Sequence, residues 1–221
     1  MNYLSWDTMR EADSGAEKIE SLYDAGYLAT RLGKGIFTKT RSVRIRLSKF
    51  ALTSENKRIL KKVEHISLSK INLPHKEYHW QIGKLAKDFY ETKFGRGIMS
   101  AQKIKEILTD SEKSNFNALL VFNDSNIVDD TGFAICYKSG KILHYSYPFY
   151  NLENPSVPKS MGLGMMSKAI EWAKENGLEF VYLGSLQRPT DTYKLQFEGM
   201  EWFDGERWQT DLKEAKKILE I

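Results

Sequence analysis

The sequence predicts an α/β (α+β) fold in which a mixed sheet is flanked by helices. An antiparallel hairpin is expected over residues 117–149, because apolar runs there are separated by turn residues. A loop, an amphipathic helix and a short buried strand follow over residues 158–184, and a second hairpin turns at Asp204-Gly205. Hairpins on both sides of one helix–strand unit are typical of a mixed, mostly antiparallel sheet.

The composition is that of a globular protein. The chain has 221 residues, of which 41% are hydrophobic and 12% aromatic, so it can bury a substantial core in one domain or two. It contains no run of about 18 apolar residues that would span a membrane. We also find no signal-peptide pattern near Met1. Its single cysteine, Cys136, excludes an internal disulfide and a cysteine-based metal site. We expect a cytoplasmic protein without a metal.

The chain divides into a basic N-terminal region, residues 1–75, and a main domain, residues 76–221. We expect a helix over residues 1–25 and another over residues 54–65. Both carry apolar residues at helical spacing and a residue type that starts or stops a helix. Residues 66–79 have the character of a connector.

The strand between these helices, residues 41–50, alternates apolar and charged side chains. Val43 and Ile45 alternate with Arg44 and Arg46, which is the period-two pattern of a half-buried strand. One face should therefore enter the core, while the other presents two guanidinium groups.

Basic residues are concentrated in this strand and in the helix after it. Between residues 41 and 62 the chain has eight basic side chains and one acid, Glu55. The basic residues are Arg41, Arg44, Arg46, Lys49, Lys57, Arg58, Lys61 and Lys62. They form either a solvated face or a surface for the phosphate backbone of a nucleic acid. Because two adjacent elements are both basic, the nucleic-acid interpretation has more support than a single charge run would give it.

The main domain begins with two helices and leads into an aromatic strand. One helix is predicted over residues 80–94, and the next starts after Ser100. The hairpin's second strand ends in four aromatic residues, Tyr145, Tyr147, Phe149 and Tyr150. Such a cluster is usually core, but Tyr147 and Tyr150 are also candidates for stacking on a terminal adenine.

The loop after these aromatic residues has the features of a phosphate site. Gly162 and Gly164 lie where a helix begins, so the backbone N–H groups there lack helical partners and are free to point at an anion. Lys159 and Ser160 precede them and supply a positive charge and a hydroxyl group. Because a Gly-x-Gly sequence alone is weak evidence, the order of the surrounding elements matters more.

That order resembles the GNAT acyltransferase fold, and several segments resemble the arginyl-tRNA–protein transferase family, including its bacterial leucyl-transferring relatives. The segments follow the family's order and span most of residues 20–197. They are Leu22–Gly26, Arg44–Phe50, Ser54–Lys62, Phe149–Asn151, Ser160–Gly162, Lys174–Leu178, Tyr182–Gly184 and Tyr193–Lys194. The resemblance implies a GNAT-type catalytic core, an amino acid carried by tRNA as the donor, and a protein or peptide amine as the acceptor, as in N-degron formation.

The resemblance also implies roles for residues near the end of the chain. Aminoacyl transfer starts from an activated ester, so positioning does much of the work. The amine must lose a proton, and the oxyanion needs a donor. Tyr193 is the expected donor to the oxyanion or leaving oxygen, and Asp191 is the expected guide or base for the amine. Lys194 is expected to hold a tRNA phosphate.

Other substrate contacts are expected from the strand and the loop. Main-chain groups beside Tyr182 and Gly184 should be exposed where the strands of a GNAT core part, and Arg188 follows them. Lys159 and Ser160, with the two glycines, would hold a phosphate of the tRNA acceptor end rather than coenzyme A. Lys159 stands where coenzyme A-dependent members carry Arg or Gln.

The sequence departs from the transferase family at Asn151, where the family has aspartate, and at Thr190, where it has lysine. Acceptor recognition or the choice of amino acid is expected to differ accordingly. Two alternatives stay open. One is an acyl-coenzyme A-dependent N-acetyltransferase, and the other is a tRNA-binding relative without catalysis. Aminoacyl-tRNA would be a co-substrate, so the main interpretation needs no bound cofactor.

Overall fold

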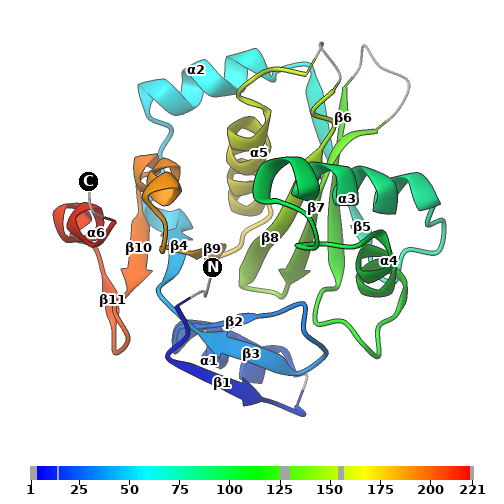
Figure 1. The fold of residues 1–221 in the computed structure, drawn as a ribbon. Coiled ribbons are helices and arrows are strands. Elements are labelled where there is room, and N and C mark those ends of the chain that lie inside the picture. Colours follow the sequence, from blue (N-terminus) through cyan, green and yellow to red (C-terminus); the bar gives the residue numbers. More distant parts are fainter. Residues whose placement is uncertain (1–3, 14, 125–129, 154–156, 220–221) are drawn as a thin grey trace.

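The computed structural model describes residues 4–13, 15–124, 130–153 and 157–219 (Figure 1). A three-stranded antiparallel sheet lies at one end of the molecule, drawn in blue at the bottom of the figure. Its strands, in the order β1–β3–β2, are β1 (Asp7–Arg10), β3 (Ile36–Lys39) and β2 (Tyr27–Ala29).

The large sheet has eight strands in the order β11–β10–β4–β9–β8–β7–β6–β5. In chain order these are β4 (Ser42–Arg46), β5 (Ile66–Asn72), β6 (Ala118–Asp124), β7 (Asp130–Lys138), β8 (Ile142–Tyr150), β9 (Phe180–Ser185), β10 (Met200–Phe203) and β11 (Trp208–Gln209). Neighbouring strands in the described sheet are antiparallel except β8 and β9, which are parallel. The predicted fold class, a mixed and mostly antiparallel sheet flanked by helices, is confirmed.

Helices cover both faces of this sheet. They are α1 (Ala16–Asp24), α2 (Ser54–Lys62), α3 (Trp80–Phe94), α4 (Ala101–Thr109), α5 (Met161–Glu175) and α6 (Leu212–Ile218), with short 3₁₀ helices η1 (Leu47–Lys49) and η2 (Pro189–Gln196). The helix α2 starts with a capping box in which Thr53 accepts a hydrogen bond from the Asn56 N–H and the Asn56 side chain accepts one from the Thr53 N–H. The turn after α5 uses Gly177, whose φ of 72° suits glycine.

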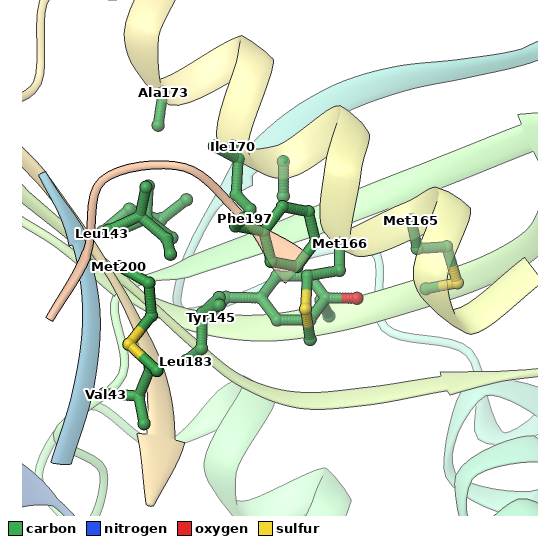
Figure 2. Close-up of a cluster of buried hydrophobic side chains, with 14 of the residues drawn as sticks. Val43, Leu143, Tyr145, Met165, Met166, Ile170, Ala173, Leu183, Phe197 and Met200 are labelled. Carbon is green, nitrogen blue, oxygen red and sulfur yellow. The ribbon is translucent and has the colours of Figure 1, made fainter. Parts of the chain in front are cut away.

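The two faces of the sheet bury two separate cores. Along β6, Leu120 and Phe122 join α5 in one cluster, which we call the α5-side core (Figure 2). Leu119 and Val121 join α1, α3 and α4 in the other, the α3-side core. This alternation follows from the two-residue period of a strand, so each face of the sheet carries its own set of helices.

Three elements differ from the sequence-based predictions. The helix predicted over residues 1–25 is confined to α1, because residues 7–10 form the strand β1, which pairs with β3. The predicted connector at residues 66–79 begins with the strand β5, which pairs with β6. In β4, Arg44 is buried instead of solvent-exposed, because β4 lies inside the sheet between β10 and β9. Short polar strands of this kind are stabilised by tertiary pairing, which local sequence patterns do not show.

Residues 1–75 supply both β4 and β5 to the large sheet, so strands of the two predicted regions lie in one sheet. None of the helices described combines the length and apolar character needed to cross a bilayer.

Candidate functional site

The strands β8 and β9 part after a short paired stretch. Their parallel register covers three residue pairs and ends at His144 and Tyr182, although β8 continues to Tyr150 and β9 to Ser185. We call the region beyond the last pair the β8–β9 fork. Gly184 lies within it with a φ of 77°, and a Cβ built there would meet no atom within 4 Å. The exposed main chain expected at Gly184 stays a prediction. The same prediction is wrong for Tyr182, which pairs with strands on both sides.

A β-bulge in β8 directs neighbouring aromatic side chains to opposite faces. Cys136 of β7 lies opposite Tyr145, while the preceding residue lies opposite Tyr147, so Ser146 is extra. Tyr145 accordingly belongs to the α5-side core. Tyr147 packs on the α3-side core, with its ring centroid 5.3 Å from that of Phe116. The aromatic cluster of the sequence thus serves two separate faces.

The start of α5 brings several predicted residues together. Ser160 is the N-cap residue, and its buried Oγ has no hydrogen-bond partner among the described atoms. The Tyr150 hydroxyl lies over Gly162, where a Cβ would come 3.4 Å from the phenol oxygen. Burial raises the pKa of Tyr150, and the Gly162 N–H offsets part of that rise. Lys159 is exposed beside them, so this corner offers a cation to a ligand, with the Ser160 hydroxyl buried next to it.

Gly164 has a different role from the one predicted. Its N–H donates to the Ser160 carbonyl oxygen at 2.8 Å, so it is not available to an anion. A Cβ at Gly164 would lie 2.7 Å from a Val63 methyl carbon. The glycine is therefore required for the close approach of the chain at the end of α2 to α5.

Asp191 closes the first turn of η2. Its Oδ2 accepts hydrogen bonds from the backbone N–H groups of Gln187 at 3.0 Å and Arg188 at 2.9 Å. Burial by itself raises the pKa of Asp191, but the Lys194 ammonium and those two N–H groups outweigh it, and the pKa is lowered. The predicted role as a base is wrong for this arrangement, because a carboxylate with a lowered pKa is a weak base toward an amine.

Lys194 is buried as well, with 5% of its surface exposed. Its Nζ donates to the Ser185 carbonyl oxygen and lies 3.6 Å from Asp191 Oδ1. Burial lowers its pKa to about 8. The predicted contact with a tRNA phosphate is wrong, since the ammonium does not reach the surface. Lys194 instead ties η2 to the end of β9.

Two phenol groups, of Tyr193 in η2 and Tyr145 in β8, lie close enough to interact electrostatically. Tyr193 is 40% exposed, and its partial burial raises the pKa of its phenol to about 12, with the Asp191 carboxylate contributing. Tyr145 is 2% exposed, and its Oη has no hydrogen-bond partner among the described atoms. Burial raises its pKa, and Tyr193 adds to that rise. Figure 2 shows the Tyr145 ring beneath α5, with its oxygen on the side of Met165. Both phenols stay protonated at neutral pH and are therefore hydrogen-bond donors.

Tyr145 was not among the residues expected at the site. A tyrosine at a buried strand position brings a hydroxyl group that needs a partner, and this is the signal that the sequence offered. The tertiary structure was needed to show that the Tyr145 hydroxyl has no hydrogen-bond partner among the described atoms.

The rim of the site is formed by η2 and the end of α3. The Arg188 guanidinium lies 5.5 Å from the Phe94 ring centroid and 3.5 Å from Asp191. On α3, the Tyr90 hydroxyl donates to the Pro148 carbonyl oxygen at 3.2 Å. These contacts hold α3 and η2 near the end of β8.

Two arginines of the basic strand are not available to a nucleic acid. Arg44 donates to Glu201 and to Asp24, each at 2.7 Å. Its guanidinium lies between the rings of Phe180 and Trp208, at 4.2 and 3.9 Å from their centroids. The predicted exposure of Arg44 is wrong, because a central strand of a covered sheet has no free face.

Arg46 has a similar environment. It donates to both carboxylate oxygens of Glu201, at 2.6 and 3.2 Å, so its charge is already paired. Arg41 is half-buried, and one of its guanidinium N–H groups donates to the Leu186 carbonyl oxygen at 3.3 Å. The strand's three arginines thus hold strand β4 to β10 and to the chain that leaves β9.

The basic helix, by contrast, is exposed. We call its solvent-facing side chains, Lys57, Arg58, Lys61 and Lys62, the basic surface, in which Arg58 is paired with Glu55. Lys49 is exposed before the helix begins. Since Val63 packs on Gly164, the basic surface borders the first turns of α5 (Figure 1). The structure therefore places these charges on the same side of the sheet as the start of α5.

The sheet order, the single parallel pair and the crossover helix α5 define a GNAT-like fold. No protein-family model matches the chain, and no curated protein matches it. Among solved structures it is similar to L-PGS from Bacillus licheniformis, with 14% identity over 76% of this chain and 49% of that one and a TM-score of 0.48. It is also similar to the C-terminal domain of a putative lysylphosphatidylglycerol synthetase from Agrobacterium fabrum, with 14% identity over 76% and 51% and a TM-score of 0.46.

A third similar structure is FemX, with 9% identity over 80% of this chain and 62% of that one and a TM-score of 0.44. The chain spans about half the length of the first two structures. At these low identities the similarity is one of fold alone, that is, of the arrangement of helices and strands.

Proposed function

We propose that this protein is an aminoacyltransferase that moves an amino acid from a charged tRNA to the free amine of a protein or peptide. The observation that carries the proposal is the basic surface beside the start of α5, which adjoins the β8–β9 fork. A cationic helix at that position suits an RNA backbone. The collinear segments that resemble the arginyl- and leucyl-transferring family support the same proposal.

The proposed reaction is the attack of an uncharged amine on the aminoacyl ester carbonyl carbon. A C–N bond forms, the C–O bond to the ribose breaks, and the proton of the amine passes to the ribose oxygen. Tyr193 is the proposed donor to the oxyanion or to that leaving oxygen. The pKa of Tyr193 is about 12, so its phenol is protonated at neutral pH and offers an O–H group where negative charge develops.

The remaining groups position the substrates. The main chain at Gly184 is the proposed contact for the ester carbonyl, and Lys194 and Asp191 hold η2 so that Tyr193 faces the fork. Lys159 and Ser160 at the start of α5 are proposed to bind a phosphate of the tRNA acceptor end. Since charged tRNA is the donor, we expect the protein to work in the cytoplasm.

A transfer assay tests the proposal directly. A mixture of tRNAs charged with radiolabelled amino acids is incubated with the full chain and a panel of peptides with free N-termini. We expect label on the peptides, and we expect Tyr193→Phe to lower kcat by about 100-fold while tRNA binding is unchanged. Absence of transfer for every amino acid, with tRNA still bound, would identify a non-catalytic tRNA-binding relative.

Filter binding separates the donor classes. Charged tRNA should be retained by the protein, and coenzyme A should not displace it. Displacement of tRNA by coenzyme A, or binding of coenzyme A alone, would instead identify an acyl-coenzyme A-dependent N-acetyltransferase.

A further inference from the structure

A groove of about 460 Å³ lies between α3 and the segment that follows β8. Its apolar wall includes Leu85 and Phe89 of α3 together with the Tyr150 ring. Phe89 belongs to the α3-side core, so the groove lies on the face of the sheet opposite α5 and the basic surface. This volume is in the range that holds a small ligand or one or two amino-acid residues.

Tyr150 connects this groove with the proposed active site. Its ring lies 4.9 Å from the Phe89 ring centroid and packs against both cores, while its hydroxyl lies over Gly162 at the start of α5. Because β8 and β9 are paired at the other end of β8, the groove adjoins the open end of the fork. A ligand in the groove and one at the start of α5 would therefore approach Tyr150 from opposite faces.

The charges in the groove favour a cation. Asp88 and Glu153 line it together with one lysine, Lys84. Lys84 is 2.6 Å from Asp88, and both carboxylates raise its pKa. Two carboxylates and one ammonium leave an excess of negative charge, which attracts a protonated amine and repels an RNA backbone. The excess is exposed to solvent, since 47% of the Asp88 side chain is accessible.

From these observations we infer that the groove binds the acceptor as a peptide or protein N-terminus with an apolar first residue. The first side chain lies against Leu85 and Phe89, and the α-ammonium lies toward Asp88 and Glu153. This inference rests on the proposed function, because it assigns the acceptor of that reaction. The donor then enters from the α5 side and the acceptor from the α3 side, and they meet at the fork.

Peptide binding to the full chain tests the inference without any transfer step. Tetrapeptides carrying a fluorophore at the C-terminus and leucine at the free N-terminus are titrated by fluorescence anisotropy. The double variant Asp88→Asn, Glu153→Gln should weaken binding by about fivefold or more, and N-terminal acetylation of the peptide should weaken binding to the wild type similarly. A peptide that begins with aspartate should also bind about fivefold more weakly.

Glu91→Gln is the matched control. Glu91 lies on the same helix and pairs with Lys87 as Asp88 pairs with Lys84, but it does not line the groove. We expect this variant to bind the leucine peptide like the wild type. Circular dichroism of all variants confirms that the helix is intact.

Equal binding by the double variant and the wild type would overturn the inference. Displacement of the peptide by a short single-stranded RNA ending in adenosine would overturn it too, and would assign the groove to the donor. If the peptide binds as expected but no charged tRNA supports transfer, the result contradicts the proposed function and still supports the peptide site.

Discussion

At the scale of single residues, the surroundings of a charged side chain decide its role more than the residue type does. Arg44 and Lys57 belong to the same basic stretch of the sequence, but Arg44 is 3% exposed and bound to two carboxylates, whereas Lys57 lies at the surface. Removing one member of a buried ion pair leaves an uncompensated charge, while an exposed lysine contributes little. Mutation of Arg44 should therefore destabilise the fold far more than mutation of Lys57.

Substituting Arg44→Met should lower the free energy of unfolding by about 3–5 kcal/mol, because it leaves Glu201 with one cationic partner instead of two. Lys57→Met should change it by less than about 0.5 kcal/mol. Urea unfolding followed by circular dichroism measures both. Equal values for the two variants would show that the buried pair does not stabilise the fold.

Lys194 gives a prediction about pH. Its pKa is lowered from 10.5 to about 8 by burial, so between these values the unfolded chain binds more protons than the native protein. The free energy of unfolding should therefore rise with pH through this window, by roughly 2 kcal/mol between pH 7 and pH 9.5. Lys194→Met should lack this contribution, and Lys57→Met should keep it. Parallel pH profiles of wild type and Lys194→Met would contradict the prediction.

At the scale of elements, the site depends on two local irregularities. The bulge at Ser146 turns Tyr145 toward α5 and Tyr147 toward α3. Where β8 parts from β9, a Cβ added at Gly184 would meet no other atom within 4 Å. Regular strands would pair throughout and offer a ligand no main-chain group. The contact between α2 and α5 is the third element-scale feature, because it sets where the basic surface lies.

Gly164→Ala should separate α2 from α5. The added Cβ would lie 2.7 Å from Val63, so we expect a loss of about 1–3 kcal/mol in stability. Gly162→Ala is the matched control. Its Cβ comes no closer than 3.4 Å to Tyr150, and this variant should fold with near wild-type stability.

The pair Gly164→Ala, Val63→Ala checks the cause. Removing the two Val63 methyl groups makes room for the new Cβ, so the double variant should be more stable than the sum of the single effects by about 1 kcal/mol. Additive effects in thermal unfolding would show that the clash with Val63 is not what Gly164 avoids.

At the scale of the whole molecule, the sheet separates two surfaces of different charge. The basic surface lies over α5, while the groove beside α3 has an excess of carboxylates. The modest net charge of +4 conceals this separation. Long-range attraction of a nucleic acid depends on such local fields more than on the net charge.

The charge reversal Lys57→Glu, Lys61→Glu should weaken binding of charged tRNA by about tenfold or more at moderate salt, because two phosphate contacts are lost and two repulsions are added. The slope of log K against log salt should fall by about 2. Filter binding over a salt series measures both. Lys76→Glu, Lys105→Glu changes the same charge on the α3 side and should leave the slope unchanged. The same loss in both variants would mean that the RNA does not use the basic surface.

Much of the fold followed from periodicity in the sequence. The helix α3 was predicted at its observed bounds, and the hairpin of β7 and β8 was expected from its turn residues. The strands β1 and β5 were missed, because their residues become strands only through pairing with β3 and β6. Of the candidate site, the loop at Ser160 and Gly162 was identified correctly as a helix start.

The sequence by itself determined the helices, the hairpins and the amount of positive charge, since these depend on neighbours along the chain. Tertiary structure decided which of those charges are free. The charged groups of Arg44 and Lys194 are buried and paired inside the protein, whereas the α2 lysines lie at the surface. The physical reason is that solvation and pairing depend on contacts between residues far apart in the chain, such as Arg44 with Glu201. No local pattern in the sequence specifies those contacts.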